Sequence, residues 1–481
     1  MPAPRAPRKL RIAFVHPDLG IGGAERLVVD AALGLQKLGH SVDIYTSHHD
    51  PKHCFDETRD GTLSVHAIDP PFPRAFKGKF HIFFSHARQL HLTSHLLCSN
   101  ATRYDVYFVD QLSTCVPLLR MFGHTRVVFY CHFPDKLLAD GAYVEDRIQR
   151  KGGLLKRIYR FPMDWLEEAT TRQADIILAN SNFTARVFQA HFRSIQVTPE
   201  VVYPGINLAA YEVSSVDDKD PDVLQVASDR PTLLSLNRFE RKKNAALAIN
   251  AFARLREKVS TTPHLKSMRL VIAGGYDPRL EDNMMAFVLL LDRAKANSLT
   301  YDIVQPRSSH VNVPPFHTTK DNPDILFLLN FTTSQRSALL SSPSTLALLY
   351  TPENEHFGIG PVEGMVCGVP VLACDSGGPT ESIIDYPPKD RTGWLRKPDP
   401  DVWAEALLEI VTLPKEERVA LGEREKRRAQ ENFGMEAMAK GIETALDRAV
   451  KMGRIHGFNS MWIVFFTLVF VPIIATILFN R

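Results

Sequence analysis

The sequence lacks paired cysteines, a marked excess of either charge and an apolar leader at its amino end. Its six cysteines are scattered over 481 residues with no CxxC pair, which argues against a disulfide framework and predicts reduced thiols facing a cytosolic compartment. The 57 basic and 54 acidic residues leave a net charge of +3, so the overall charge does not favour nucleic acid as a partner. Residues 1–9 are rich in proline and basic residues, which predicts a short disordered tail and no signal peptide.

One long apolar run lies near the carboxyl end, where residues 461–479 carry no charge. A membrane-spanning helix needs about 20 such residues, so this run predicts a transmembrane anchor, with a buried core helix as the alternative. Basic residues precede the run at Arg448, Lys451 and Arg454, and only Arg481 follows it. This bias predicts that the bulk of the protein faces the cytosol.

The rest of the chain is typical of a globular protein, with 44% hydrophobic and 23% charged residues and a length that favours two or three domains. A first series of apolar runs predicts strands at Leu10–His16, Ser41–Thr46, Val106–Asp110, Arg126–Cys131, Ala174–Ala179 and Val201–Tyr203. A second series predicts strands at Thr232–Leu236, Arg269–Ala273, Ile325–Leu329, Leu346–Tyr350 and Pro370–Ala373. Helical patterns occupy Ala24–Leu38, Ala245–Arg256, Gly358–Val366 and most of Val402–Leu446, with a break at Gly434.

Strands that alternate with helices predict parallel sheets with helices on both faces. We therefore expect an α/β protein with two doubly wound, Rossmann-like domains, at residues 10–205 and 206–430, facing a cleft. Residues 431–458 are expected to form a helix that returns toward the first domain. Residues 280–342 are the least regular part and are expected to form helix and long loops, with no clean strand before Ile325. Ligands of such sheets bind at the carboxyl ends of the strands.

A glycine-rich loop follows the first predicted strand and opens a helix, with Gly20, Gly22, Gly23 and then Glu25. Glycines allow close approach of a ligand to the backbone, and a helix amino end favours anions, so we expect a phosphate or a sugar hydroxyl there. A plain tight turn is the alternative. Glu25 replaces the third glycine of a dinucleotide fingerprint, although Asp43 stands where an NAD site carries its ribose acid.

Two further motifs carry charge at the mouth of the second predicted sheet. Arg238 and Lys243 follow the strand at 232–236, where cations would neutralise a diphosphate leaving group. Glu355 and Glu363 lie between a strand and a helix, and carboxylates are good acceptors for the hydroxyls of a sugar or a ribose. Taken singly, each motif is also compatible with solvated charges beside a turn.

Together these motifs resemble those of the family 4 retaining glycosyltransferases, which have the GT-B architecture. The resemblance covers roughly residues 10–446. It depends on Gly20-x-Gly-Gly23, Arg238-x4-Lys243, Glu355-x7-Glu363, Cys367-Gly-x-Pro-Val371 and Gly377-Gly-x-x-Glu381. More narrowly, residues 130–135, residues 237–244 and the apolar tail resemble the eukaryotic α-1,3/1,6-mannosyltransferases of dolichol-linked oligosaccharide assembly.

The resemblance implies a role for each matching residue. Arg238 and Lys243 match the pair that grips the donor diphosphate, and Glu363 matches the carboxylate that binds the ribose. Glu355 matches the carboxylate facing the donor sugar and the reaction centre. His132 matches a histidine near the donor sugar, with a hydrogen-bonded core histidine as the alternative.

The remaining implied contacts divide between donor and acceptor. Donor contacts are expected from Phe357, Gly358, Gly22 and Gly23, and acceptor contacts from Gly22, His356 and Asp135. The family usually has glycine where this chain has His356, which leaves the local backbone and the acceptor contacts open. No metal or other cofactor is expected, because such enzymes generally use protein cations and helix dipoles instead.

The implied function is transfer of mannose from GDP-mannose to the Man-GlcNAc2-diphosphate-dolichol intermediate of N-glycan precursor assembly. The implied linkages are α-1,3 and α-1,6, formed with retention of configuration at the cytosolic face of the endoplasmic reticulum membrane, where other enzymes of the pathway are possible partners. The alternatives are another membrane-bound family 4 enzyme with a different nucleotide sugar, a silent GT-B-like scaffold and, more distantly, an NAD-dependent oxidoreductase. The basic, apolar segments at 80–98 and 147–165 fit a membrane surface and ordinary packing helices equally well.

Overall fold

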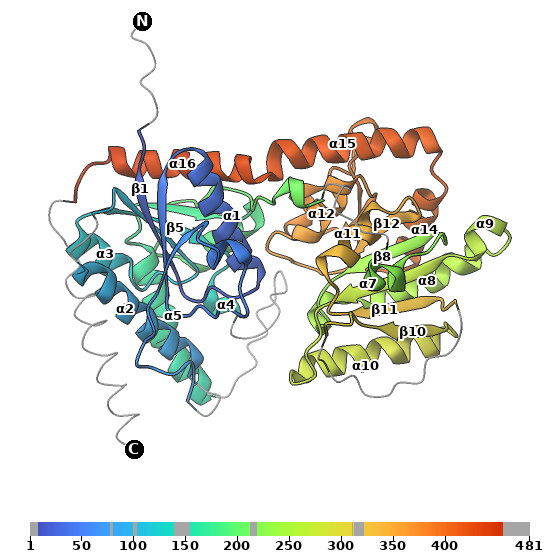
Figure 1. The fold of residues 1–481 in the computed structure, drawn as a ribbon, viewed down its shortest axis with the longest axis horizontal. Helices are drawn as coiled ribbons and strands as arrows, with labels where there is room; N and C mark the ends of the chain where they lie inside the picture. Colours follow the sequence, from blue (N-terminus) through green and yellow to red (C-terminus); the bar gives the residue numbers. More distant parts are fainter. Residues whose placement is uncertain are drawn as a thin grey trace, which may run out of the picture. The chain divides into compact units, whose positions relative to one another are not determined.

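The computed structural model describes residues 8–76, 80–99, 103–138, 154–211, 219–309, 311 and 322–455, without the side chains of residues 154–158. The chain divides into two units (Figure 1). Unit 1 runs from the amino end to Ile206 and resumes at Gly434, and unit 2 comprises Asn207–Phe433. The sequence placed the corresponding boundaries after residues 205 and 430.

Unit 1 contains a parallel sheet of order β3-β2-β1-β4-β5-β6-β7. Its strands are β1 (Arg11–His16), β2 (Ser41–Thr46), β3 (Ser64–Ala67), β4 (Val106–Asp110), β5 (Arg126–Cys131), β6 (Ile176–Ala179) and β7 (Glu200–Val201). The sequence missed β3 because this edge strand has only four residues and is mostly exposed. The strand order reverses between β1 and β4, so the carboxyl ends of these two strands form the switch point where such sheets bind ligands.

The helices of unit 1 cover both faces of this sheet, as the sequence predicted. They are α1 (Gly23–Lys37), α2 (His81–Cys98), α3 (Val116–Gly123), α4 (Asp135–Leu138), α5 (Leu154–Thr171), α6 (Asn182–His191) and α16 (Met435–Lys451), with the short helix η1 at Asp56–Thr58. Successive residues of β1 point to opposite faces. Phe14 packs in a cluster with α1 and α16, whereas Val15 packs in a cluster with α2, α3 and α6.

Helix α16, the last of the described helices, belongs to unit 1, although it follows unit 2 in the sequence (Figure 1). The backbone amide of Met435 donates to the carbonyl of Ile206 at 3.0 Å, so the chain leaves and re-enters unit 1 at neighbouring points. A Cβ atom on Gly205 would lie 2.7 Å from the carbonyl oxygen of Gly434, and only glycine allows this close approach.

Helix α2 contains the first of the two segments for which membrane contact was left open. Its apolar side chains, including Phe83, Phe84 and Leu92, are buried within unit 1, which supports the packing alternative. The described part of α5 exposes Phe161 to 75% and also exposes Trp165. The predicted span at 461–479 lies outside the described residues. Among the residues that are described, no helix is long and apolar enough to cross a membrane.

Unit 2 contains a second parallel sheet, of order β10-β11-β9-β8-β12-β13-β14. Its strands are β8 (Thr232–Leu236), β9 (Arg269–Gly274), β10 (Tyr301–Val304), β11 (Ile325–Leu329), β12 (Thr345–Tyr350), β13 (Val371–Cys374) and β14 (Trp394–Arg396). The expectation of no strand between residues 280 and 325 was wrong, because β10 pairs with β11 along its whole length. The strand order reverses between β8 and β12, which places the second switch point at their carboxyl ends.

The helices of unit 2 are α7 (Pro221–Val226), α8 (Ala246–Lys258), α9 (Pro263–Lys266), α10 (Glu281–Ala296), α11 (Thr333–Ser341), α12 (Ile359–Cys367), α13 (Pro379–Ser382), α14 (Pro400–Val411) and α15 (Lys415–Phe433). Shorter helical turns are η2 (Leu208–Tyr211), η4 (Arg241–Lys243) and η5 (Pro388–Asp390). Helices α8, α10 and α14 share the core cluster on one face, and α12 packs on β12 and β13 with α15 outside it. The six cysteines are all free thiols, as the sequence predicted.

Candidate functional site

The loop after β8 carries the two predicted diphosphate cations of unit 2. The amide of Phe239 donates to the carbonyl of Gly275 at 3.0 Å, which ties the loop to the end of β9. A Cβ atom on Gly274 would lie 1.8 Å from the carbonyl oxygen of Asn237, so this contact requires glycine. The side chain of Arg238 is 66% exposed and pairs with Glu240 at 3.2 Å. Arg238 therefore stands at the rim of the switch point with its guanidinium accessible to a ligand.

Lys243, the second cation, is joined directly to Glu355. Its Nζ lies 2.6 Å from Glu355 Oε1, and its carbonyl accepts a 2.6 Å hydrogen bond from the Thr351 hydroxyl. The buried Tyr350 side chain, at the end of β12, also lies beside the Glu355 carboxylate. Burial alone would raise the pKa of Glu355, but the charge and hydrogen bond of Lys243 outweigh burial and lower it, and His356 adds to this effect. The result is an ionised carboxylate fixed at the switch point.

Glycine turns fix the backbone around Glu355. The amide of Gly378 donates to the Glu355 carbonyl at 2.7 Å, and a Cβ atom on Gly378 would lie 2.3 Å from backbone atoms of Phe357. Gly358 has a φ of +86° and begins α12 directly above the Tyr350 ring. Phe357 is buried with its ring centroid 5.6 Å from that of Phe433. The Phe357 side chain is therefore part of the packing beneath the loop. Any donor contact by this residue, as predicted, would have to come from its backbone.

Glu363, the predicted ribose carboxylate, lies on α12 in a second cluster of unit 2. Tyr211 donates its hydroxyl to Glu363 Oε1, and Arg336 of α11 donates to the same oxygen at 3.1 Å. The Arg336 guanidinium also lies over the Tyr211 ring, 4.8 Å from its centroid. Sequence reasoning missed Tyr211 and Arg336, because neither belongs to a motif and both meet Glu363 only through the fold.

The glycine loop of unit 1 leads directly into α1. Gly22 is the residue before the helix, and α1 has no side-chain cap at that end. A Cβ atom on Gly23 would meet nothing within 4 Å in the described part of the chain. The first turn of α1 thus has no side-chain cap, and the Glu25 carboxylate lies beside Gly22, so binding of an anion or a hydroxyl group there stays a prediction.

His132 follows β5 and is linked to two residues that the sequence analysis did not select. Its Nε2 lies 2.9 Å from Asp110 Oδ2, and His16 Nδ1 lies 2.7 Å from Asp110 Oδ1. His16 ends β1 and Asp110 ends β4, so all three residues meet at the switch point of unit 1. A sequence signal was present, because each residue ends or directly follows a predicted strand.

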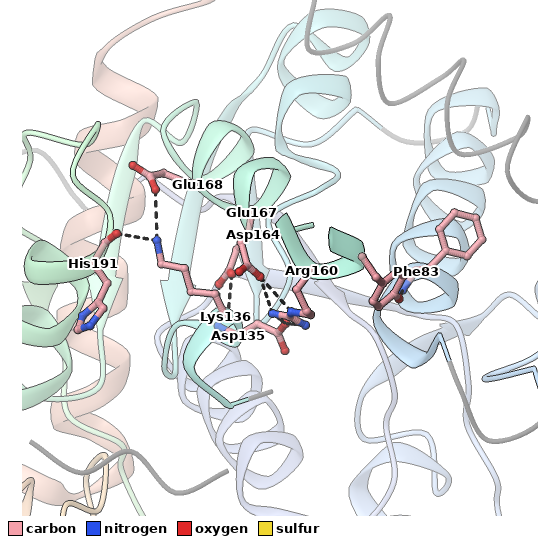
Figure 2. A network of polar contacts seen from close by, with 9 residues as sticks. Phe83, Asp135, Lys136, Arg160, Asp164, Glu167, Glu168 and His191 are labelled. Carbon is pink, nitrogen blue, oxygen red and sulfur yellow. Dashed lines mark hydrogen bonds and ion pairs between the residues drawn. The ribbon is translucent and has the colours of Figure 1, made fainter. Parts of the chain in front are cut away.

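Asp135, a predicted acceptor contact, belongs to a polar network around α4 and α5 (Figure 2). Arg160 donates to Asp135 Oδ2 at 3.2 Å and also pairs with Asp164. The buried Glu167 carboxylate accepts from the backbone amide of Asp135 at 2.7 Å and from that of Lys136 at 3.0 Å. Asp135 is thus held by α5, and its carboxylate is only partly available to a ligand.

Asp43, the residue that raised the NAD alternative, is occupied within the sheet of unit 1. Tyr104 donates its hydroxyl to Asp43 Oδ2 at 3.0 Å, and His66 Nε2 lies 3.4 Å from Oδ1. These contacts give Asp43 a structural role, which weakens the oxidoreductase alternative.

Two family models match the chain in agreement with its two units. The model for Glycosyltransferase Family 4 matches residues 21–210, and the model for Glycosyl transferases group 1 matches residues 319–428. The chain is 44% identical over 442 residues to the α-1,3/1,6-mannosyltransferase ALG2 of Rhizomucor pusillus, covering 91% of this chain and 92% of the relative. The Saccharomyces cerevisiae ALG2 is 40% identical over 449 residues, covering 92% and 85%.

The chain belongs to the α-1,3/1,6-mannosyltransferase ALG2 family.

Membership makes the chain a glycosyltransferase, as the sequence predicted. Solved structures show the fold independently. Sucrose-phosphate synthase from Thermosynechococcus elongatus matches with a TM-score of 0.66 at 18% identity, covering 92% of this chain and 100% of that one. The catalytic domain of starch synthase IV from Arabidopsis thaliana matches with a TM-score of 0.65 at 14% identity, with the same coverage of both chains.

Proposed function

We propose that this mannosyltransferase transfers mannose from GDP-mannose to dolichyl-diphosphate-linked Man-GlcNAc2, forming α-1,3 and α-1,6 linkages. The observation that supports the chemistry best is the ionised Glu355, held by Lys243 and Tyr350 at the switch point of unit 2. In a member of the α-1,3/1,6-mannosyltransferase family, this is where a nucleotide sugar is expected to bind.

In the proposed reaction, the bond between mannose C1 and the diphosphate breaks on the same face on which the acceptor oxygen attacks. The acceptor hydroxyl loses its proton to the departing GDP, and the new glycosidic bond keeps the α configuration. Lys243 and the exposed Arg238 stabilise the charge that grows on the diphosphate. Glu355 orients the sugar through its hydroxyls, and Glu363 accepts from the ribose hydroxyls. Protein cations fill the place of a metal ion in this scheme.

We further propose that residues 461–479 anchor the enzyme in the endoplasmic reticulum membrane with both units in the cytosol. The support is the uncharged composition of this run and the excess of basic residues before it. The proposed acceptor is linked to a lipid, so an anchored enzyme and its acceptor would lie at the same membrane surface.

The test is mannose transfer to a synthetic dolichyl-diphosphate Man-GlcNAc2 acceptor, with GDP-mannose and UDP-glucose compared as donors. Product should form with GDP-mannose as donor and not with UDP-glucose. It should be lost in Lys243→Ala and Glu355→Ala. Lys258→Ala is the matched control, because Lys258 forms an equally short pair with Glu405 on the surface of unit 2. Transfer from UDP-glucose instead would support a different family 4 activity, and folded enzyme inactive with a panel of nucleotide sugars would support a scaffold.

A further inference from the structure

His16, Asp110 and His132 lie at the carboxyl ends of three neighbouring strands in unit 1. Together they form one hydrogen-bonded group. Asp110 and His16 are completely buried, with side-chain exposures of 1% and 0%, whereas His132 is 19% exposed. Burial opposes ionisation of Asp110, but the two histidines outweigh it and lower its pKa. Because Asp110 is then a carboxylate, the nitrogen facing each of its oxygens carries the proton. His132 therefore donates through Nε2, and its other ring nitrogen is not engaged by Asp110.

We propose that Asp110 and His16 are positioning residues that fix the orientation and tautomer of His132 for mannose transfer. The inference rests on the proposed function, in which His132 contacts the sugar at the reaction centre. An imidazole hydrogen-bonded only through one nitrogen presents the other in a defined direction, as second partners do for histidines in many active sites. Asp110 thus sets which nitrogen of His132 meets the ligand, and His16 holds Asp110.

The backbone around His132 is fixed as firmly as its ring. Asn180 donates to the His132 carbonyl at 2.9 Å, and the Tyr130 ring lies against the imidazole with centroids 5.1 Å apart. Three residues further on, Glu167 accepts both amide groups at the start of α4. The residue is therefore held through its backbone, its ring face and one ring nitrogen, which leaves the partly exposed edge for a ligand.

The cost of this arrangement favours a functional role over a packing role. His16 Nε2 is buried and has no hydrogen-bond partner among the described residues. A buried nitrogen without a partner destabilises a fold, and an apolar side chain at the end of β1 would avoid the penalty. The other polar groups that face His16 are the Glu25 carboxylate and a backbone group of Asp18, and Tyr130 lies near Asp110. None of these replaces His16 as a donor to Asp110.

The first test compares Asp110→Asn with Asp175→Asn in the full-length enzyme. Asp175 is the matched control, because its side chain is only 3% exposed in unit 1 and joins two cations, Arg120 at 3.0 Å and Arg126 at 2.7 Å, at the opposite end of the sheet. Asp110→Asn should lower kcat by about 10- to 100-fold while KM for GDP-mannose changes less than about twofold. Asp175→Asn should lower the melting temperature and leave kcat unchanged.

Variants of His16 separate the hydrogen bond from the charge. Asparagine can place an amide N–H near the position of Nδ1, so His16→Asn should keep most of kcat, whereas His16→Leu should resemble Asp110→Asn. The inference is overturned if Asp110→Asn keeps full kcat, or if Asp110→Asn and Asp175→Asn lose kcat equally in proportion to stability. If the wild type transfers no mannose, the proposed function fails instead, and the same kcat ratios are measured with the nucleotide sugar that the panel identifies.

Discussion

Units 1 and 2 each hold an ionised carboxylate at the switch point of their sheet, yet they stabilise it with different chemistry. Glu355 of unit 2 is held by a lysine and a tyrosine, Lys243 and Tyr350. Asp110 of unit 1 is held by two histidines, His16 and His132. Lysine and tyrosine side chains ordinarily keep their protons throughout the neutral range, whereas histidine ordinarily titrates near pH 6.5.

The difference suggests a division of labour between the two units. In unit 2 the carboxylate and its cation form a fixed pair suited to a charged donor, and the pair is independent of pH near neutrality. In unit 1 the carboxylate is fully buried, and only the imidazole of His132 reaches the surface. Unit 2 thus presents a fixed ion pair at its switch point, whereas unit 1 presents one oriented imidazole.

The largest expected effect follows from removing the cation of unit 2. Lys243→Met leaves the buried Glu355 carboxyl without the cation that keeps it ionised, which should lower the free energy of unfolding by about 3 kcal/mol and activity by more than about 100-fold. Adding Glu355→Gln should restore most of the stability but none of the activity. A double-mutant cycle from urea unfolding and transfer rates measures both. Equal stability of the single and double variants would contradict a coupled pair.

The next effect is a pH dependence of unit 1. Burial lowers the pKa of His16, but Asp110 outweighs it and the net shift is upward, while burial and Asp135 raise the pKa of Glu167 to about 8. A group whose pKa is raised in the folded state stabilises that state fully below its unfolded pKa. This contribution is lost as pH rises through the folded pKa. Unit 1 should therefore lose stability, by roughly 3 kcal/mol or more, as pH rises from the unfolded pKa of Glu167 near 4.5 to its folded pKa of about 8, and His16 adds to the loss above pH 6.5.

Glu355 has the opposite pH dependence. Its pKa is lowered in the folded state, so Glu355 stabilises unit 2 above its unfolded pKa near 4.5, and this contribution is lost only at more acid pH. Hydrogen exchange of β4 and β5 against β8 and β12, corrected for intrinsic rates, distinguishes the two units. Glu167→Gln and His16→Asn should each flatten part of the slope in unit 1. Burial also raises the pKa of Glu425 in unit 2, so the comparison is made in the Glu425→Gln variant, where a parallel slope in both units would remove the contrast.

A smaller effect is expected from the tyrosine beneath Glu355. Tyr350→Phe removes the polar hydroxyl beside the Glu355 carboxylate and leaves the ring that contacts Gly358 and Gly360. The expected losses are about 1.5 kcal/mol of stability and about tenfold in kcat. Tyr350→Leu removes the ring as well and should cost clearly more. If Tyr350→Phe behaves like wild type, Lys243 alone orients Glu355.

The contrast between the units also explains what the sequence could predict. Lys243 and Glu355 were predicted as site residues because charged residues and glycines in loops after strands form recognisable motifs, and most strands were placed because they are buried apolar runs. His16 and Asp110 were missed because each looks like the polar end of an apolar run, and only strand order brings them together. β10 and β14 were missed because short edge strands carry little hydrophobic pattern.

The smallest expected effect comes from Tyr211, the counterpart of Tyr350 at Glu363. Tyr211→Phe removes one donor to Glu363, but Arg336 remains bonded to the same carboxylate, so stability should fall by less than about 1 kcal/mol. Because Glu363 is expected to bind the ribose and not the reacting sugar, the change should raise KM for GDP-mannose by about two- to threefold and leave kcat unchanged. Steady-state kinetics beside Tyr350→Phe tests this directly. A kcat loss equal to that of Tyr350→Phe would mean that the two carboxylates act as one cluster, and the proposed separation of ribose and sugar contacts in unit 2 would fail.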